Sequence, residues 1–284
     1  MITQTNIWGE LEQADAQYNS IAGAVLNVKD FNKLDITSHS TRIEGSTLTL
    51  SEAINLIEKG TPATGKPIDH QNMVLDYYEA LEFVLEEAAK KTVVDLPLIQ
   101  SIASKTMRRT GRIVNSVLGN TDESQGELRK VNVSAGGKYF VDQARVSEML
   151  DRLVANIRQN IGLVKSTQEV YTFAFETHFD LVSIHPFTDG NGRVSRLMMN
   201  FIEAYHNRPL TLVHEEDKAI YFDSLKESDK SKSTGPIVEF LAKQHIKFLE
   251  SQILAYQKGI SAEIKPESKI SAKKGNAPGY SLFF

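Results

Sequence analysis

Apolar residues recur along most of the chain at the spacing of amphipathic helices. The pattern is clearest over residues 146–161, where apolar side chains return every three or four positions and Gly162 follows as a stop. In another segment, Pro236 suits a first helical turn and Gly259 a stop. The sequence therefore predicts a mainly α protein. Besides the helix over 146–161, further helices are expected over residues 50–59, 70–91, 217–228 and 236–258.

Two more helices are expected on either side of one short polar segment. The first covers residues 166–184, because Ser166 and Glu169 have capping-box spacing and the apolar run ends just before a His-Pro pair. The second begins within the sequence GNGR and ends near residues 207–209. The segment between them, HPFTDGNGRVSR (residues 185–196), is therefore a helix–loop–helix junction.

Two stretches depart from the helical pattern. Residues 129–142, RKVNVSAGGKYFVD, place apolar runs on either side of Ser-Ala-Gly-Gly and predict a β-hairpin. Residues 260–284 have no clean period and end in the apolar GYSLFF, for which docking on the chain's own core or on a neighbouring subunit both stay open. We expect an N-terminal helical region over residues 1–62, a core over 63–259 and a tail over 260–284.

Composition and charge narrow the classes of protein. The 284 residues are 41% hydrophobic, which is enough for a sizeable core. The 32 basic and 36 acidic residues give a net charge of −4, so neither a nucleic-acid partner nor a membrane surface is indicated. The chain has no cysteine, no N-terminal signal and no apolar run of membrane-spanning length. We expect a cytoplasmic protein.

The residues at the start of the helix after the junction are suited to binding phosphate. Gly190 and Gly192 flank Asn191 and let backbone N–H groups point to one place, where the helix N-terminus adds partial positive charge. Arg193 and Arg196, three positions apart, lie on neighbouring parts of one helix face and can each fork onto phosphate oxygens. A di- or triphosphate is the natural occupant.

Two residues of the junction can supply the chemistry. Asp189 beside phosphates would be repelled unless Mg²⁺ bridged them, and Mg²⁺ commonly takes only one or two protein carboxylates. His185 can accept a proton from a hydroxyl nucleophile. Phe187 is expected in the core, as an anchor for the loop. His178 is expected to pack or cap, and the remaining histidines have no zinc-ligand spacing.

The pattern His185-Pro-Phe-x-Asp-Gly-Asn-Gly-Arg-x-x-Arg196 resembles the signature of Fic-domain proteins, a family of mainly helical nucleotidyltransferases. The resemblance covers roughly residues 40–260. It implies that His185 deprotonates a Ser, Thr or Tyr hydroxyl of a target protein, which attacks the α-phosphate of ATP and receives AMP. It further implies that Asp189 holds Mg²⁺ and that Gly190, Asn191, Gly192, Arg193 and Arg196 bind the phosphates.

The resemblance also gives meaning to two other segments. The hairpin would be the family's flap, which aligns the target segment by strand addition, with Lys138, Tyr139 and Phe140 as docking residues. In SHSTRIEGSTLTL, the residues Ser40, Glu44 and Gly45 resemble the inhibitory motif of Fic proteins, whose glutamate pairs with the second arginine, here Arg196. A competing interpretation is that Thr41 and Glu44 form a capping box at the start of a helix.

Several functions stay open at this point. Removal of AMP from a modified target, self-modification, a different nucleotide, homodimer formation and a nucleotide-sensing binding module are all compatible with these residues. Transfer of a bare phosphate is disfavoured, because that branch of the family has lysine at the position of Gly192. A DNA-binding regulator would rest on a helix pair in SIASKTMRRTGRIVNSVL with Arg108, Arg109 and Arg112, which a solvated basic face explains as well.

Overall fold

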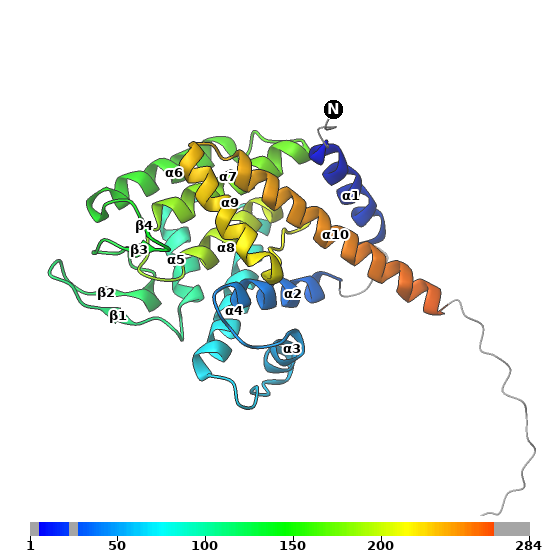
Figure 1. Cartoon of the computed structure of the whole chain (residues 1–284), viewed down its shortest axis with the longest axis horizontal. Helices are drawn as coiled ribbons and strands as arrows, with labels where there is room; N and C mark the ends of the chain where they lie inside the picture. Colours follow the sequence, from blue (N-terminus) through cyan, green and yellow to red (C-terminus); the bar gives the residue numbers. More distant parts are fainter. Residues whose placement is uncertain (1–5, 23–27, 264–284) are drawn as a thin grey trace, which may run out of the picture.

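The structure, a computed structural model, describes residues 6–22 and 28–263, and helices dominate it (Figure 1). Two antiparallel hairpins accompany them, β1 Ile113–Val114 with β2 Thr121–Asp122, and β3 Ser134–Ala135 with β4 Lys138–Tyr139. The predicted mainly α fold with a β-hairpin is confirmed. The α-helices in the described ranges are α1 Ile7–Ala22, α2 Val28–Ile43, α3 Leu50–Lys59, α4 Ile68–Ala89, α5 Leu96–Thr106, α6 Val146–Asn160, α7 Thr167–Ile184, α8 Asn191–Tyr205, α9 Lys218–Ser231 and α10 Gly235–Glu263.

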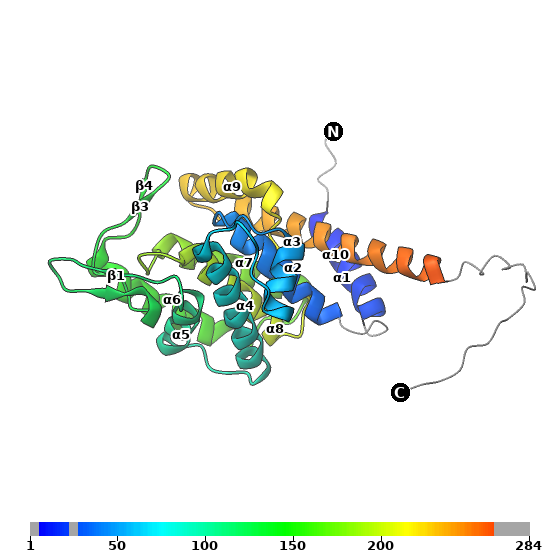
Figure 2. The ribbon, with the colours of Figure 1, turned by 90° about the horizontal axis from the view of Figure 1, so that it is seen from below.

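Helices α7 and α8 lie side by side in the middle of the molecule, and the others pack around them. Helix α4 contacts α8, α1 runs along α10, and α2 lies against α4 (Figures 1 and 2). Both hairpins project from one end of the helical body, on the left in both views, and the end of α10 lies at the opposite end. The loop between α7 and α8 is therefore held by the most enclosed helices of the fold.

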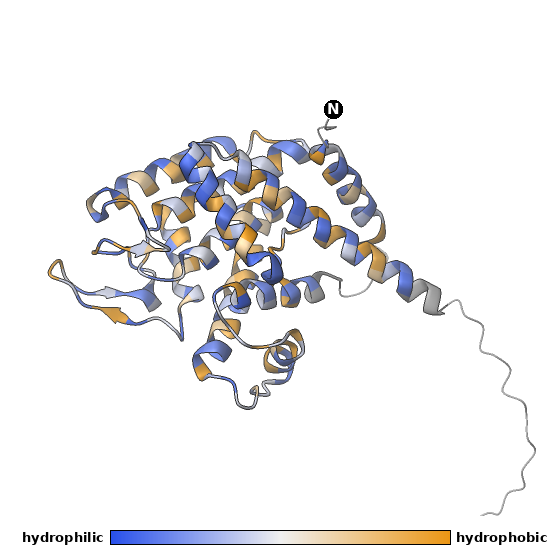
Figure 3. Ribbon diagram, viewed as in Figure 1, coloured by the Kyte–Doolittle hydropathy of each residue, from blue (hydrophilic) through white to orange (hydrophobic). Residues whose placement is uncertain are grey.

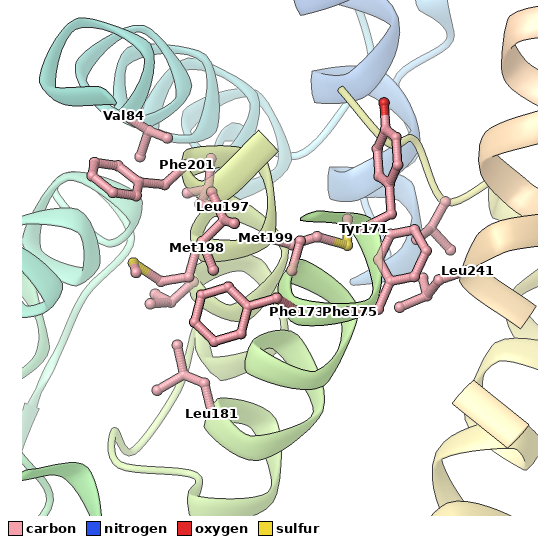
Figure 4. Close-up of a cluster of buried hydrophobic side chains, with 14 of the residues drawn as sticks. Val84, Tyr171, Phe173, Phe175, Leu181, Leu197, Met198, Met199, Phe201 and Leu241 are labelled. Atoms are coloured by element: carbon pink, nitrogen blue, oxygen red, sulfur yellow. The ribbon is translucent and has the colours of Figure 1, made fainter. Parts of the chain in front are cut away.

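The interior is built from the apolar stripes that the sequence shows. Figure 4 shows Phe173 of α7 beside Met198 of α8, and Phe175 toward Leu241 of α10. Most helices carry apolar and polar residues side by side (Figure 3), and within residues 6–22 and 28–263 no helix is long and apolar enough to cross a membrane. A smaller cluster, separate from the main core, lies beneath α3.

The helix before the junction begins as predicted. The hydroxyl of Ser166 accepts the N–H of Glu169 at 3.2 Å, and the carboxylate of Glu169 accepts the N–H of Ser166 at 2.9 Å. The end predicted for α10 at Gly259 is wrong, because the helix continues to Glu263. A single glycine costs a helix only about 1 kcal/mol, so it does not end one by itself. Residues 264–284, which contain GYSLFF, lie outside the described residues.

The helix pair considered for residues 101–118 is absent. Helix α5 ends at Thr106, and the chain turns into strand β1 instead of a second helix. The arginines there pair with acids of α4: Arg109 lies 2.8 Å from Asp76, and Arg108 lies 3.1 Å from Glu79. These contacts secure the turn after α5, and the helix pair on which a DNA-binding regulator would rest is not formed.

The β3–β4 hairpin lies inside the predicted range, although its strands are only two residues long. Ser134 pairs with Tyr139 and Ala135 with Lys138. Gly136 and Gly137 form the turn with φ of 59° and 79°, and both values lie in the left-handed region that a type I′ turn requires. The hairpin is therefore short, tightly turned and free of a third strand within the described residues.

Candidate active site

The loop between α7 and α8 is held in shape by the side chain of Asn191. Its amide oxygen accepts the N–H of Phe187, and its amide nitrogen donates to the carbonyl of Phe187, both at 2.9 Å. Phe187 is buried, as predicted. The sequence analysis placed Asn191 among the phosphate-binding residues but did not predict that its side chain would bridge the loop. Because both bonds are buried, they fix the loop from inside.

His185 ends α7 in a strained but well-held conformation. Its φ of 53° and ψ of 59° are left-handed, which costs a non-glycine residue about 1–2 kcal/mol. Nδ1 lies 3.2 Å from the carbonyl of Val182. Because a carbonyl only accepts, the neutral ring carries its proton on Nδ1, and Nε2 keeps its lone pair. The ring stacks on Phe140 of the hairpin, with 3.7 Å between centroids.

The protonation state of His185 suits a base. Burial lowers the pKa of His185 to about 4, against the weaker opposing effect of its bond to Val182. The ring is therefore neutral at pH 7, and its Nε2 is available to take a proton.

The N-terminus of α8 begins at Gly190, as a phosphate-binding turn would require, and a carboxylate lies over it. Gly190 is the N-cap, with φ of 79°. A Cβ built on Gly192 would come within 2.6 Å of Glu44 Oε1. The first N–H groups of a helix have no partner within the helix and attract anions. Glu44 thus stands close to where a phosphate would be bound.

Glu44 reaches this place through Arg196. Nη2 of Arg196 lies 2.7 Å from Oε1 of Glu44, while Nε donates to the hydroxyl of Ser40 at 2.7 Å and Nη2 to its carbonyl at 3.1 Å. Burial by itself would raise the pKa of Glu44, but the charges of Arg196 and Arg193 outweigh it, and the pKa lies below its ordinary value. Gly45 follows with φ of 102°, where glycine is favoured. Glu44 is therefore a charged partner of Arg196.

The capping-box interpretation of Glu44 is wrong. Glu44 follows the last residue of α2, so it lies past the end of a helix and not at the start of one. The hydroxyl of Thr41 donates back to the carbonyls of Thr37 and Ser38 within α2. Helix α3 has its own capping box, formed by Thr49 and Glu52. Glu44 therefore caps neither helix.

Asp189 and Arg193 differ in exposure, although Nη2 of Arg193 lies 3.6 Å from Oδ2 of Asp189. The side chain of Asp189 is 63% exposed, and its Oδ1 accepts the N–H of Gly190 at 2.6 Å. One outward carboxylate beside an anion site fits Mg²⁺, which completes its shell with phosphate and water oxygens. Arg193 is buried, 3.4 Å from the carbonyl of Thr106 and 3.1 Å from the sulfur of Met107. It does not line the cavity described next.

A cavity of about 600 Å³ brings these elements together. His185, Asp189, Asn191, Gly192, Arg196 and Glu44 line one part of it. Lys138 and Phe140 line it from the hairpin, whereas Tyr139 does not and is 83% exposed. Lys138 also forms an ion pair with Asp229 of α9, at 3.1 Å. An apolar wall that the sequence analysis did not identify comes from α7 and α9, with Phe179, Val182, Tyr221, Phe222 and Leu225.

His178 has a structural role in the core. Nε2 of His178, a buried residue, lies 2.8 Å from the hydroxyl of Tyr221, so His178 packs as predicted. Burial lowers the pKa of His178 to about 3, and it stays neutral. Among residues 6–22 and 28–263, no group of three or more His, Cys, Asp or Glu side chains is placed to hold a metal ion.

Comparison with known proteins gives consistent results. Residues 93–202 match the Fic/DOC family. The chain is similar to the protein adenylyltransferase Fic of Drosophila melanogaster, with 27% identity over 239 residues, covering 82% of this chain and 46% of that protein. The same-named protein of Culex quinquefasciatus is 27% identical over 205 residues, covering 72% of this chain and 38% of its own length. The chain thus spans less than half the length of these relatives.

Solved structures of low sequence identity share the fold. A Fic domain containing signaling protein from Bacteroides thetaiotaomicron superposes with a TM-score of 0.73 at 22% identity, over 88% of this chain and 97% of that one. Fic-1 (residues 134–508) from C. elegans superposes with a TM-score of 0.72 at 21% identity, over 89% of this chain and 73% of that one.

Proposed function

Because residues 93–202 of this chain match the Fic/DOC family, we propose that it is a protein adenylyltransferase that moves AMP from ATP to a hydroxyl of a target protein. We further propose that Glu44 restrains this activity and that the reaction takes place in the cytoplasm. The relatives named protein adenylyltransferase support the reaction. The single observation that carries the restraint is the 2.7 Å contact between Glu44 and Arg196 in the cavity that also contains His185.

In the proposed reaction, Nε2 of His185 takes the proton of a Ser, Thr or Tyr hydroxyl. The hydroxyl oxygen forms a bond to the α-phosphorus of ATP, the bond from that phosphorus to the bridging oxygen breaks, and pyrophosphate leaves. The donated bond to Val182 keeps Nε2 unprotonated and oriented before the reaction. The apolar wall from α7 and α9 suits a flat, weakly polar base such as adenine.

The N-terminus of α8 would bind the phosphates. The backbone of Gly190, Asn191 and Gly192 would cradle the phosphates, and Arg196 would fork onto their oxygens. Arg193, whose Nη2 lies 3.6 Å from Oδ2 of Asp189, would contribute positive charge. Asp189 would hold Mg²⁺, which when bound supplies positive charge to the phosphate oxygens.

The charge and position of the Glu44 carboxylate would restrain the reaction. A phosphate approaching Arg196 meets a carboxylate already paired with it, and like charges repel at short distance. ATP would then be excluded, or held with its α-phosphate away from the attacking hydroxyl. Removing the carboxylate should return Arg196 to the phosphates. The hairpin, with Lys138 and Phe140 at the cavity, would present the target segment by strand addition.

The test compares intact masses of wild type, Glu44→Gly and Glu44→Gly/His185→Ala after incubation with ATP and Mg²⁺, with and without a cytoplasmic extract. We expect added AMP on the Glu44→Gly protein, or on extract proteins exposed to it, and none in the double variant. No adduct in any sample, with ATP binding intact by calorimetry, would contradict transfer and favour a nucleotide-sensing module.

Removal of AMP from a target is a second candidate, because a carboxylate and a neutral imidazole line the same cavity. Glu44 could orient a water toward an AMP–target bond. Any protein that Glu44→Gly modifies can serve as the substrate. Release of AMP from this substrate by wild type, but not by Glu44→Gly, would support removal as the main activity. Equal release by both proteins would contradict it.

A further inference from the structure

Arg129 is a buried cation that is bonded to backbone carbonyls. The residue is 3% exposed. Nε donates to the carbonyl of His185 at 2.7 Å, Nη1 to that of Val131 at 2.7 Å, and Nη2 to that of Val141. Its own backbone N–H donates to the carbonyl of Pro186 at 3.0 Å. Burial lowers the pKa of Arg129, with the charge of Asp142 opposing the shift. One residue thus joins two segments that are far apart in sequence.

The first of these segments is the root of the β3–β4 hairpin. Val131 and Val141 lie on its two legs, beyond the last backbone bond of the hairpin, from Phe140 N–H to the Val133 carbonyl at 3.2 Å. The guanidinium therefore connects the legs where strand pairing has ended. A planar fork with separate donors can span two carbonyls and a third group, whereas the single ammonium of lysine cannot do so in the same geometry.

The second segment is the C-terminal end of α7. A carbonyl at a helix end has no partner within the helix, and here Arg129 supplies one to His185, whose backbone is left-handed. The ring of the same histidine stacks on Phe140 of the hairpin. The hairpin and the base are thus joined twice, by a ring contact and by Arg129.

We propose that Arg129 is a positioning residue that couples the hairpin to His185, so that a target segment held by the hairpin arrives in line with Nε2. The proposal rests on the proposed function, because it assigns Arg129 a part in aligning the accepting hydroxyl. It does not place Arg129 in contact with substrate. ATP binding, which uses the N-terminus of α8, should be independent of it.

The experiment places Arg129→Lys and Arg129→Gln in the Glu44→Gly protein. The lysine variant keeps the positive charge, whereas the glutamine variant removes it. Two variants are used so that a folding defect in one of them does not decide the result. Arg112→Lys is the control, because the Arg112 side chain is 80% exposed. Three properties are measured: AMP added to the chain and to extract proteins, ATP affinity by calorimetry, and the titration of His185 by NMR, assigned through His185→Ala.

We expect both Arg129 variants to transfer AMP at least about tenfold more slowly, which corresponds to about 1.4 kcal/mol. ATP affinity should stay within about twofold, because the dissociation constant depends on contacts that Arg129 does not make. In Arg129→Lys, which keeps the positive charge, the pKa of His185 should rise toward its ordinary value of 6.5, because a loosened loop admits water to the ring. In Arg129→Gln it should rise further, because the charge of Arg129, which also lowers this pKa, is removed. Arg112→Lys should change none of the three.

Two results would overturn the proposal. One is an unchanged His185 titration in folded Arg129→Lys, which keeps the charge, whatever happens to transfer. The other is a fall in ATP affinity that matches the fall in transfer, which is the pattern of a general structural defect. If Glu44→Gly itself transfers no AMP, the proposed function fails, and the His185 titration still decides whether Arg129 positions the base.

Discussion

The loop between α7 and α8 and the β3–β4 hairpin face the same cavity but are held in opposite ways. The loop is fixed from inside by two 2.9 Å bonds from Asn191 and by buried Phe187. The hairpin has two-residue strands, and the Tyr139 side chain is 83% exposed. The part that would bind the nucleotide is thus pre-organised, whereas the part that would meet a protein keeps open strand edges. Preorganisation suits a group that reacts identically at each turnover.

The largest expected effect is on the loop side. His185→Ala should slow AMP transfer in the Glu44→Gly protein by at least about a hundredfold, because general-base catalysis contributes about 10²–10⁴. Its ATP affinity should stay within about twofold, since the base acts only in the chemical step. Single-turnover transfer and calorimetry measure the two. Loss of ATP binding together with activity would make His185 a structural residue.

Asn191→Ala tests whether the loop is fixed from inside. It leaves the buried N–H and carbonyl of Phe187 without partners, so we expect the free energy of unfolding to fall by about 2 kcal/mol. Transfer should fall as well, because the N-terminus of α8 moves with the loop. Chemical denaturation measures the first effect. Asn115→Ala, at an exposed position, is the control; equal stability of the two variants would contradict the account.

Tyr139→Ala tests the hairpin side. The exposed side chain should contribute nothing measurable to stability, with a change within about 0.5 kcal/mol. The KM for a protein substrate should rise by about threefold to tenfold, while the KM for ATP stays unchanged. Tyr139→Phe, which keeps the ring, should behave more like wild type. A loss of stability similar to that of Asn191→Ala would show that the hairpin is as rigidly built as the loop.

The smallest effect concerns the far end of α8. Burial raises the pKa of Glu203 from 4.5 to about 7, although its carboxylate accepts the N–H of Thr211. Because the pKa of Glu203 is raised in the folded state, protonated Glu203 stabilises the folded state at low pH. This contribution is lost as the pH rises from about 4.5 through about 7. The melting temperature of wild type should therefore fall relative to that of Glu203→Gln over this range, by a few degrees. Parallel curves for the two proteins would contradict the shift.

The sequence predicts the central helices and the loop because their chemistry is local. The stripes of α6 and α8 and the Ser166–Glu169 box each lie within a few turns of chain. Residues 1–62 were expected to be helical, but α2 was not predicted as a separate helix, because it buries polar residues such as Thr37, Ser38 and Thr41, which hides the apolar period.

The parts of the site that the sequence analysis missed depend on contacts between distant segments. The apolar wall from α9 carries no motif, and Arg129 acts on backbone carbonyls, which leave no trace in residue type. Arg193 was assigned to phosphate, but its orientation toward Thr106 depends on how α5 packs. Motif spacing indicates which residues meet near the loop, and packing decides which of them face the cavity.

The most direct test of the central proposal is the initial rate of AMP incorporation by Glu44→Ala relative to wild type, with Glu58→Ala as the control. Glu58 is an exposed carboxylate of the same N-terminal region. If Glu44 restrains the enzyme by pairing with Arg196, Glu44→Ala should be at least about tenfold faster than wild type, about 1.4 kcal/mol, and Glu58→Ala equal to it. Equal rates for wild type and Glu44→Ala would contradict the restraint.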